Sequence, residues 1–315
     1  MHRRGDQRAA SPEVREVALV RRLRAPQFLF DDRGALRAPW RIVVFAAASL
    51  AAFIVAEAFI GPLVTGLFSV IGVRGVSNEV WTQAAAVLGG TAVSIRWVDK
   101  RPWSDVWLGR DAARPSLLAF GFAVGALAIG LPIVLLIADH WLREAASGSG
   151  SWLGAAIRVS VFLLPAALVE ELTTRGYLLS VLREAWGWPW AIGVTSVGFG
   201  LLHLANNGAN VESVALVTLA GLFLATVLYA TRSLYAAWMA HFAWNWTMAV
   251  LFHTAVSGYP LESPRYRYVD AGPDWATGGE WGPEGGLPAG LGMGLGGGIA
   301  YLFARRARNP RREET

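Results

Sequence analysis

The chain has no cysteine among its 315 residues. Disulfide bonds, a cysteine nucleophile and thiolate metal ligands are therefore excluded. Charged residues are also scarce, because they make up 16% of the chain whereas about 25% is usual for a soluble globular protein. The first 40 residues are polar and rich in arginine, and they lack the apolar core of a cleavable signal peptide, so we expect none. The scarcity of charged residues argues against a soluble domain.

Long apolar runs take the place of the missing charge. Hydrophobic residues make up 54% of the chain, and the mean hydropathy is +0.39. A membrane-spanning helix needs roughly 20 mostly apolar residues, and tryptophans such as Trp40 and Trp97 beside the runs suit the headgroup region. We predict an all-α polytopic membrane protein, a bundle of about eight transmembrane helices. The predicted spans are Ile42–Val73, Val80–Ile95, Pro115–Ala138, Trp152 to about Leu182, Trp190–Leu204, Val214–Ala230, Leu234–Phe252 and Leu287–Ala304.

Arginine is concentrated in every second connection of such an arrangement, and the other connections contain few basic residues. Because loops rich in Lys and Arg stay in the cytoplasm, we predict a multi-pass protein of the plasma membrane with both termini cytoplasmic. The basic ends are expected to contact membrane lipids, and nucleic acid is not an expected partner. The predicted parts are an Arg-rich cytoplasmic tail (1–40), a transmembrane domain (41–304) with polar motifs in 150–250, and a basic cytoplasmic tail (305–315).

Three short polar patterns interrupt the apolar segments in the second half of the chain. Ionisable side chains cost several kcal/mol to hold in lipid, so a cluster of them within the membrane is a functional site by default. The side-chain types are two carboxylates, two imidazoles, a carboxamide and a guanidinium, which is what a water-activating hydrolase needs. The patterns are Glu170-Glu171-Leu-Thr-Thr-Arg175, Phe199-Gly-Leu-Leu-His203 and His241-Phe-Ala-Trp-Asn245.

The two adjacent glutamates cannot share one role. Neighbouring residues on a helix point about 100° apart, whereas Glu171 and Arg175 are four residues apart and can pair on one face. We therefore predict a catalytic carboxylate at Glu170 and a structural ion pair between Glu171 and Arg175. The alternative is that all three form a buried salt-bridge cluster, and that the histidines and the asparagine make independent hydrogen bonds between helices.

These residue types support two kinds of hydrolytic chemistry. A desolvated carboxylate can act as a general base towards water, and a histidine can share that water. A second histidine and an asparagine amide can then stabilise the oxyanion that forms when an amide is attacked. The alternative is a zinc ion held by Glu170, His203 and His241, with one position open for water. We favour the version without a cofactor, because the HExxH pattern is absent and asparagine is an uncommon zinc ligand.

Together and in this order, the three patterns resemble the CPBP family of intramembrane proteases, which includes the type II CAAX prenyl endopeptidases and bacteriocin-processing enzymes. That family carries EExxxR, FxxxH and HxxxN or HxxxD on three spans of an eight-helix bundle, and the resemblance covers roughly residues 150–250. It implies endopeptidase activity within the bilayer, on a peptide or a protein C-terminal tail. Family names often include the word metalloprotease, and the metal is disputed.

The resemblance also implies a role for each motif residue. Glu170 and His203 would activate the water, and His241 and Asn245 would hold the oxyanion. The remaining motif residues would be structural support: Glu171, Arg175 and Phe199.

Two other functions remain open from the sequence. A proton-coupled transporter could use the same Glu, His and Arg side chains as a path, although no inverted repeat is visible. A non-catalytic membrane scaffold would have no need of complete motifs. The sequence predicts no role for the lone membrane carboxylate Glu57, beyond a structural or substrate-facing one, or for the 253–286 loop.

Overall fold

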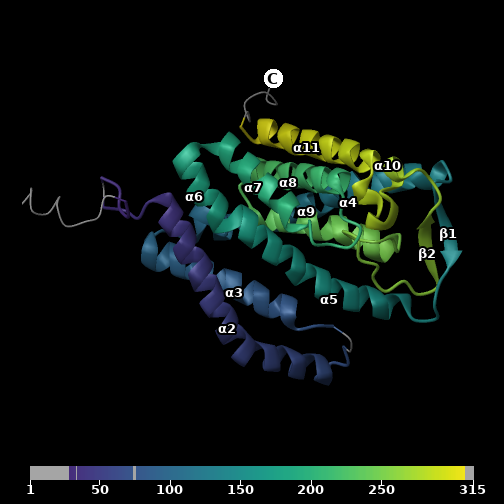
Figure 1. Cartoon of the computed structure of the whole chain (residues 1–315), viewed down its shortest axis with the longest axis horizontal. Helices are drawn as coiled ribbons and strands as arrows, with labels where there is room; N and C mark the ends of the chain where they lie inside the picture. Colours follow the sequence, from purple (N-terminus) through teal and green to yellow (C-terminus); the bar gives the residue numbers. More distant parts are fainter. Residues whose placement is uncertain (1–27, 33, 74–75, 309–315) are drawn as a thin grey trace, which may run out of the picture.

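The computed structural model describes residues 28–32, 34–73 and 76–308. Most of the predicted 1–40 tail and the end of the predicted 305–315 tail lie outside these residues. The described part is a bundle of helices with one small sheet at one end (Figure 1). The long helices are α2 (Ala38–Val70), α3 (Glu79–Val93), α4 (Pro115–Ala138), α5 (Trp152–Glu171), α6 (Tyr177–Trp186), α7 (Trp188–Leu202), α8 (Val211–Thr231), α9 (Leu234–Trp246) and α11 (Leu287–Arg308).

The chain is a polytopic membrane protein. Within the described residues, five helices are long and apolar enough to cross a membrane, and one shorter apolar helix, α7, accompanies them. The fourth predicted span is a continuous rod, Trp152–Trp186, because the π-helical turn Leu172–Gly176 joins α5 to α6. Each of the other predicted spans also coincides with a helix, although α3 and α9 are too short or too polar to count among the five.

The two ends of the bundle differ in charge. Five segments lie at the left end of the bundle in Figure 1: the start of α2, the 94–114 connection, the α6–α7 turn, the α8–α9 turn and the end of α11. Most of the described Arg side chains belong to these segments. Helix α2 begins at Ala38, and α11 continues to Arg308, so the first part of the 305–315 segment is helical.

Buried ion pairs hold the basic end together. The Arg41 guanidinium on α2 contacts Asp99 and also Glu184 of α6, at 2.8 Å in the latter case. The Tyr177 hydroxyl on α6 donates a hydrogen bond to Asp99 (3.0 Å). This cluster attaches α2 to α6 just beyond the π turn. Thr82 of α3 donates a hydrogen bond to Glu57 of α2, so this carboxylate has a structural contact between the first two helices.

The small sheet corrects the all-α prediction. β1 (Leu142–Ala146) pairs antiparallel with β2 (Tyr266–Asp270) at the end of the bundle opposite the basic one (Figure 1). The predicted 253–286 loop is therefore partly regular, and it also contains the short helix α10 (Asp274–Thr277). Five-residue strands outside the membrane carry too weak a periodicity to be recognised in a single sequence.

Glycines on α4 bring two backbones into contact. A Cβ added to Gly121 or Gly125 would lie 2.1 Å from the Ala236 oxygen or 2.0 Å from the Ala240 oxygen, both on α9. Small residues spaced four apart let membrane helices approach this closely. The helix that carries His241 is thus seated directly against α4.

This contact predicts the effect of a larger side chain. Gly125→Leu is expected to push α9 away from α4 and to destabilise the protein by about 1–3 kcal/mol or more. Thermal unfolding in detergent measures the loss. Gly130→Ala on the same helix is the matched control, because its Cβ would meet only the Thr247 methyl group at 3.6 Å. Equal unfolding temperatures for the two variants would contradict the backbone contact.

Candidate active site

The π turn after α5 begins directly after the two glutamates. Glu171 and Arg175 are both fully buried, and Arg175 Nη1 lies 2.9 Å from Glu171 Oε1. Arg175 also donates hydrogen bonds to Thr174 Oγ1 (2.8 Å) and to the Gly221 carbonyl on α8 (3.2 Å). The predicted ion pair is present, and it is tied to a neighbouring helix. Since π turns concentrate at functional sites, its position next to Glu170 is informative.

Glu171 has a second partner that the sequence analysis missed. Its Oε1 accepts a hydrogen bond from Nδ1 of His241 on α9 (2.9 Å). The carboxylate therefore holds a proton on Nδ1 of His241 and directs Nε2 of that ring towards Glu170. In a single sequence, residues 70 positions apart give no signal of such a contact.

His203 directly follows Leu202, the last residue of α7, and caps that helix. Its Nδ1 donates to the Phe199 carbonyl oxygen (2.8 Å), so a neutral His203 presents an unprotonated Nε2 on the other side of the ring. The Phe199 ring packs against both imidazoles, with centroids 4.9 Å from His203 and 5.8 Å from His241. The Arg175 guanidinium covers the same ring at 4.2 Å. Phe199 thus contacts the buried guanidinium and both imidazoles.

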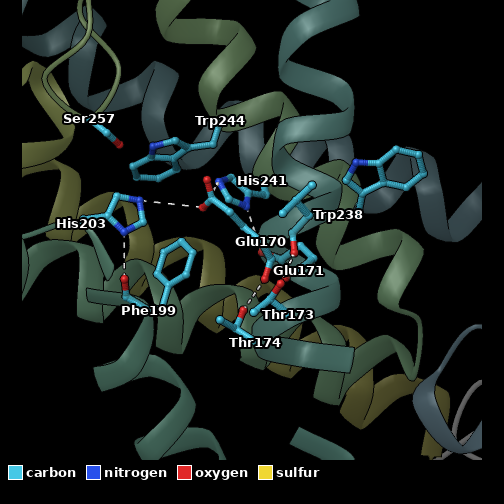
Figure 2. Close-up of polar contacts among 12 residues, drawn as sticks. Glu170, Glu171, Thr173, Thr174, Phe199, His203, Trp238, His241, Trp244 and Ser257 are labelled. Atoms are coloured by element: carbon cyan, nitrogen blue, oxygen red, sulfur yellow. Dashed lines mark hydrogen bonds and ion pairs between the residues drawn. The ribbon is translucent and has the colours of Figure 1, made fainter. Parts of the chain in front are cut away.

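Glu170 lies between the two histidines. Its Oε2 is 3.8 Å from His203 Nε2 and 3.7 Å from His241 Nε2 (Figure 2). Both separations are longer than a hydrogen bond, and this buried oxygen has no hydrogen-bond partner within the described structure. The rest of the side chain is 37% exposed, because it faces a cavity. Three of the four predicted catalytic residues therefore meet around one carboxylate oxygen.

Two cavities adjoin this cluster. The larger one, about 530 Å³, lies between α5, the end of α7 and the segment after α9, and Glu170, His203 and Asn245 are among its lining residues. The smaller one, about 20 Å³, has room for one water molecule. Its lining includes His203, His241 and Asn245. Asn245, one turn beyond His241 on α9, thus lines both spaces.

Several polar residues around the cavities were not found by sequence reasoning. Trp244, Ser257 and Glu284 line the smaller cavity, and Ser257 and Trp244 lie close to His203 and His241 in Figure 2. None of them belongs to a pattern that can be recognised in one sequence. Glu284 in particular stands in a Gly-Pro-Glu-Gly turn, which reads as an ordinary loop.

An ion pair lies beside the larger cavity. Arg158 of α5 makes a bidentate contact with Glu262, with Nη2 to Oε2 at 2.6 Å and Nε to Oε1 at 2.9 Å. The hydrogen-bonded guanidinium holds the pKa of Glu262 below its usual range. Glu262 follows Leu261, which lines the cavity, so the pair attaches the cavity-lining segment to α5.

Comparison with known families agrees with this geometry. Residues 152–247 match the family model described as Rce1-like, type II CAAX prenyl endopeptidase. This segment of the chain is thus similar to the Rce1-like family. The matched range includes Glu170, His203, His241 and Asn245. A search of curated proteins found no match to this chain.

The predicted family resemblance is therefore confirmed over residues 152–247. Rce1-like proteins are endopeptidases, so the chain is a peptide-bond hydrolase of the CAAX protease type. The match begins with α5 and ends just after α9. These helices hold the buried ion pair, both imidazoles and most of the cavity lining described above.

Proposed function

We propose that this protein is an intramembrane endopeptidase in which Glu170 and His203 activate a water molecule. The observation that carries the proposal is the position of Glu170 Oε2, 3.7–3.8 Å from two imidazole nitrogens and without a hydrogen-bond partner of its own. Two acceptors that face each other at this distance need a donor between them, and water supplies two O–H groups. A water held in this way donates one hydrogen bond to Glu170 and the other to His203.

The reaction follows from these contacts. The water oxygen attacks the carbonyl carbon of the scissile peptide bond while its proton passes to Glu170. His241 Nε2–H and the Asn245 amide donate to the oxyanion that forms. The ionised Glu171 stabilises the charged imidazolium of His241, as the aspartate of a serine protease does. When the C–N bond breaks, the proton on Glu170 is transferred to the departing amine.

Zinc is the alternative to this mechanism. Its ligands would be Glu170, His203 and His241, and the ion would supply a bound hydroxide and a Lewis acid. The contacts of His203 and His241 through Nδ1 are also of the kind that metal-bound histidines make. Among the described residues, however, no group of three His, Cys, Asp or Glu side chains has the arrangement of a metal site. We therefore propose the route without a metal.

The substrate that we propose is the C-terminal tail of a protein at the membrane, as the family description suggests. The larger cavity, bordered by apolar residues such as Phe162, Leu163 and Leu261, suits an apolar segment of that tail. The basic end of the bundle faces the cytoplasm in this proposal, with both termini on that side and all eight predicted spans crossing the bilayer. The membrane would be the plasma membrane.

A cleavage assay tests the proposal. Purified protein in lipid nanodiscs is incubated with a proteome-derived peptide library, and the products are identified by mass spectrometry. We expect internal cleavage that yields new C-termini and needs no added metal. Activity is expected to survive dialysis against a zinc chelator, with less than one zinc per ten molecules.

The chelation experiment and the cleavage assay can each contradict the proposal in a different way. Loss of cleavage on chelation, with recovery on addition of zinc, would replace the proposed mechanism by the zinc mechanism. No cleavage of any peptide, combined with proton flux through the same nanodisc protein in liposomes, would favour the transporter function instead.

A further inference from the structure

A tight turn borders the larger cavity, which Glu170 also lines. Val256 and Tyr259 exchange both backbone hydrogen bonds, with N–H to O distances of 3.0 and 2.9 Å. Between them, Ser257 and Gly258 have φ angles of 49° and 83°, the two positive values that a type I′ turn requires. Val256, Ser257 and Tyr259 all line the cavity. We refer to residues 256–259 as the cavity turn.

The cavity turn is attached to the segment that follows His203. Asn206 Nδ2 donates to the Ser257 carbonyl (3.1 Å). A Cβ added to Gly258 would lie 2.0 Å from the Asn207 carbonyl oxygen, so the two backbones touch at this point. One side of the turn is therefore held by the connection that leaves the catalytic histidine.

Glu284 holds the other side. This side chain is buried, and its Oε1 accepts hydrogen bonds from the Ser257 N–H and hydroxyl, both at 2.6 Å. Its Oε2 accepts a hydrogen bond from Trp244 Nε1 (2.8 Å). Trp244 precedes Asn245 on α9. A single carboxylate thus links the cavity turn to the helix that carries His241 and Asn245.

These contacts require a carboxylate. Both oxygens of Glu284 accept from N–H groups, one from the Ser257 backbone and one from the Trp244 indole. Glutamine has the same shape, but its NH₂ group would face one of these donors and leave it without an acceptor. A buried N–H without an acceptor is costly. Glu284→Gln therefore breaks one of the links without removing bulk.

We propose that Glu284 is a positioning residue for the substrate. By fixing the cavity turn against α9, it shapes a wall of the cavity that Glu170 also lines, and so determines how tightly the substrate tail is held there. The proposal rests on the endopeptidase function proposed above. It assigns Glu284 to substrate placement and not to proton transfer, because both of its oxygens are occupied by the turn and the indole.

The first test needs no substrate. Hydrogen–deuterium exchange is measured on full-length protein in nanodiscs for wild type, Glu284→Gln and Glu280→Gln. The exposed Glu280, four residues earlier in the same loop, is the matched control. We expect the amides of 256–259 to exchange at least tenfold faster in Glu284→Gln only, with unchanged protection in α4. Unchanged exchange in the cavity turn would overturn the proposal, whether or not the protein cleaves peptides.

The second test uses the peptide that wild type cleaves fastest in the library. Glu284→Gln is expected to raise KM at least fivefold while kcat changes less than twofold, and Glu280→Gln is expected to match wild type. A fall in kcat at unchanged KM would overturn the positioning role. Trp244→Phe, which removes the other donor and keeps an aromatic ring, should reproduce the KM increase if Glu284→Gln fails to fold. Absence of cleavage by wild type would count against the endopeptidase function alone.

Discussion

Glu170→Gln is expected to lower kcat for peptide cleavage by about 10³-fold, because loss of a general base typically costs 10²–10⁴-fold. The amide keeps the shape of the side chain but cannot take a proton from water. The oxygen concerned has no hydrogen-bond partner, so its replacement breaks no structural contact and the unfolding temperature should stay within about 2 °C of wild type. Steady-state cleavage kinetics and thermal unfolding on the same preparation measure the two quantities.

The matched control for this variant is Glu212→Gln, an exposed glutamate in the first turn of α8. It makes the same chemical change outside the site and should leave kcat within twofold of wild type. Cleavage by Glu170→Gln at a rate near that of Glu212→Gln would remove Glu170 from the mechanism. A large fall in unfolding temperature for Glu170→Gln would instead show that Oε2 makes a structural contact.

Arg175→Met is expected to produce the largest loss of stability. Arg175 and Glu171 are both 0% exposed, so removal of the guanidinium takes away the permanently charged partner of a buried carboxylate. Breaking a buried pair in this way costs about 3–5 kcal/mol, which corresponds to a fall of about 10 °C in unfolding temperature. Thermal unfolding in detergent measures the shift.

Two further variants interpret that result. Arg158→Met removes one partner of the exposed pair with Glu262, and it should shift the unfolding temperature by about 2 °C or less, because exposed pairs contribute 0–1 kcal/mol. In the double variant Glu171→Gln with Arg175→Met, neither charge of the ion pair remains and the Gln oxygen still accepts from His241 Nδ1. Most of the lost stability should therefore return. A double variant as unstable as Arg175→Met would show that the arginine acts through its other contacts.

Much of the bundle could be predicted from hydropathy and charge. Residues four positions apart on one helix, such as Glu171 and Arg175, can be predicted to contact each other. This ion pair is present at 2.9 Å. The motif order also predicted the family whose model residues 152–247 match. The catalytic roles of Glu170, His203, His241 and Asn245 remain proposals, which the kinetic variants above address.

Contacts between distant segments could not be predicted. The hydrogen bond from His241 to Glu171 joins residues 70 positions apart, and that from Trp244 to Glu284 joins residues 40 apart. Their geometry depends on how helices pack, which a single sequence does not encode in any local pattern. The β1–β2 sheet was missed for the same reason, since its strands are separated by the five helices α5 to α9 and their connections.

The π turn at Leu172–Gly176 has a consequence for the whole rod from Trp152 to Trp186. An extra residue in one turn shifts the orientation of every later side chain by about 100°. As a result, the half of the rod before the turn presents Glu170 to the cavity, whereas the half after it presents Tyr177 to Asp99 near α2. One continuous rod thus lines the cavity with its first half and anchors the α2 end of the bundle with its second half. A one-residue deletion in the π turn would rotate one half relative to the other, so that Glu170 and Tyr177 could not both keep their positions.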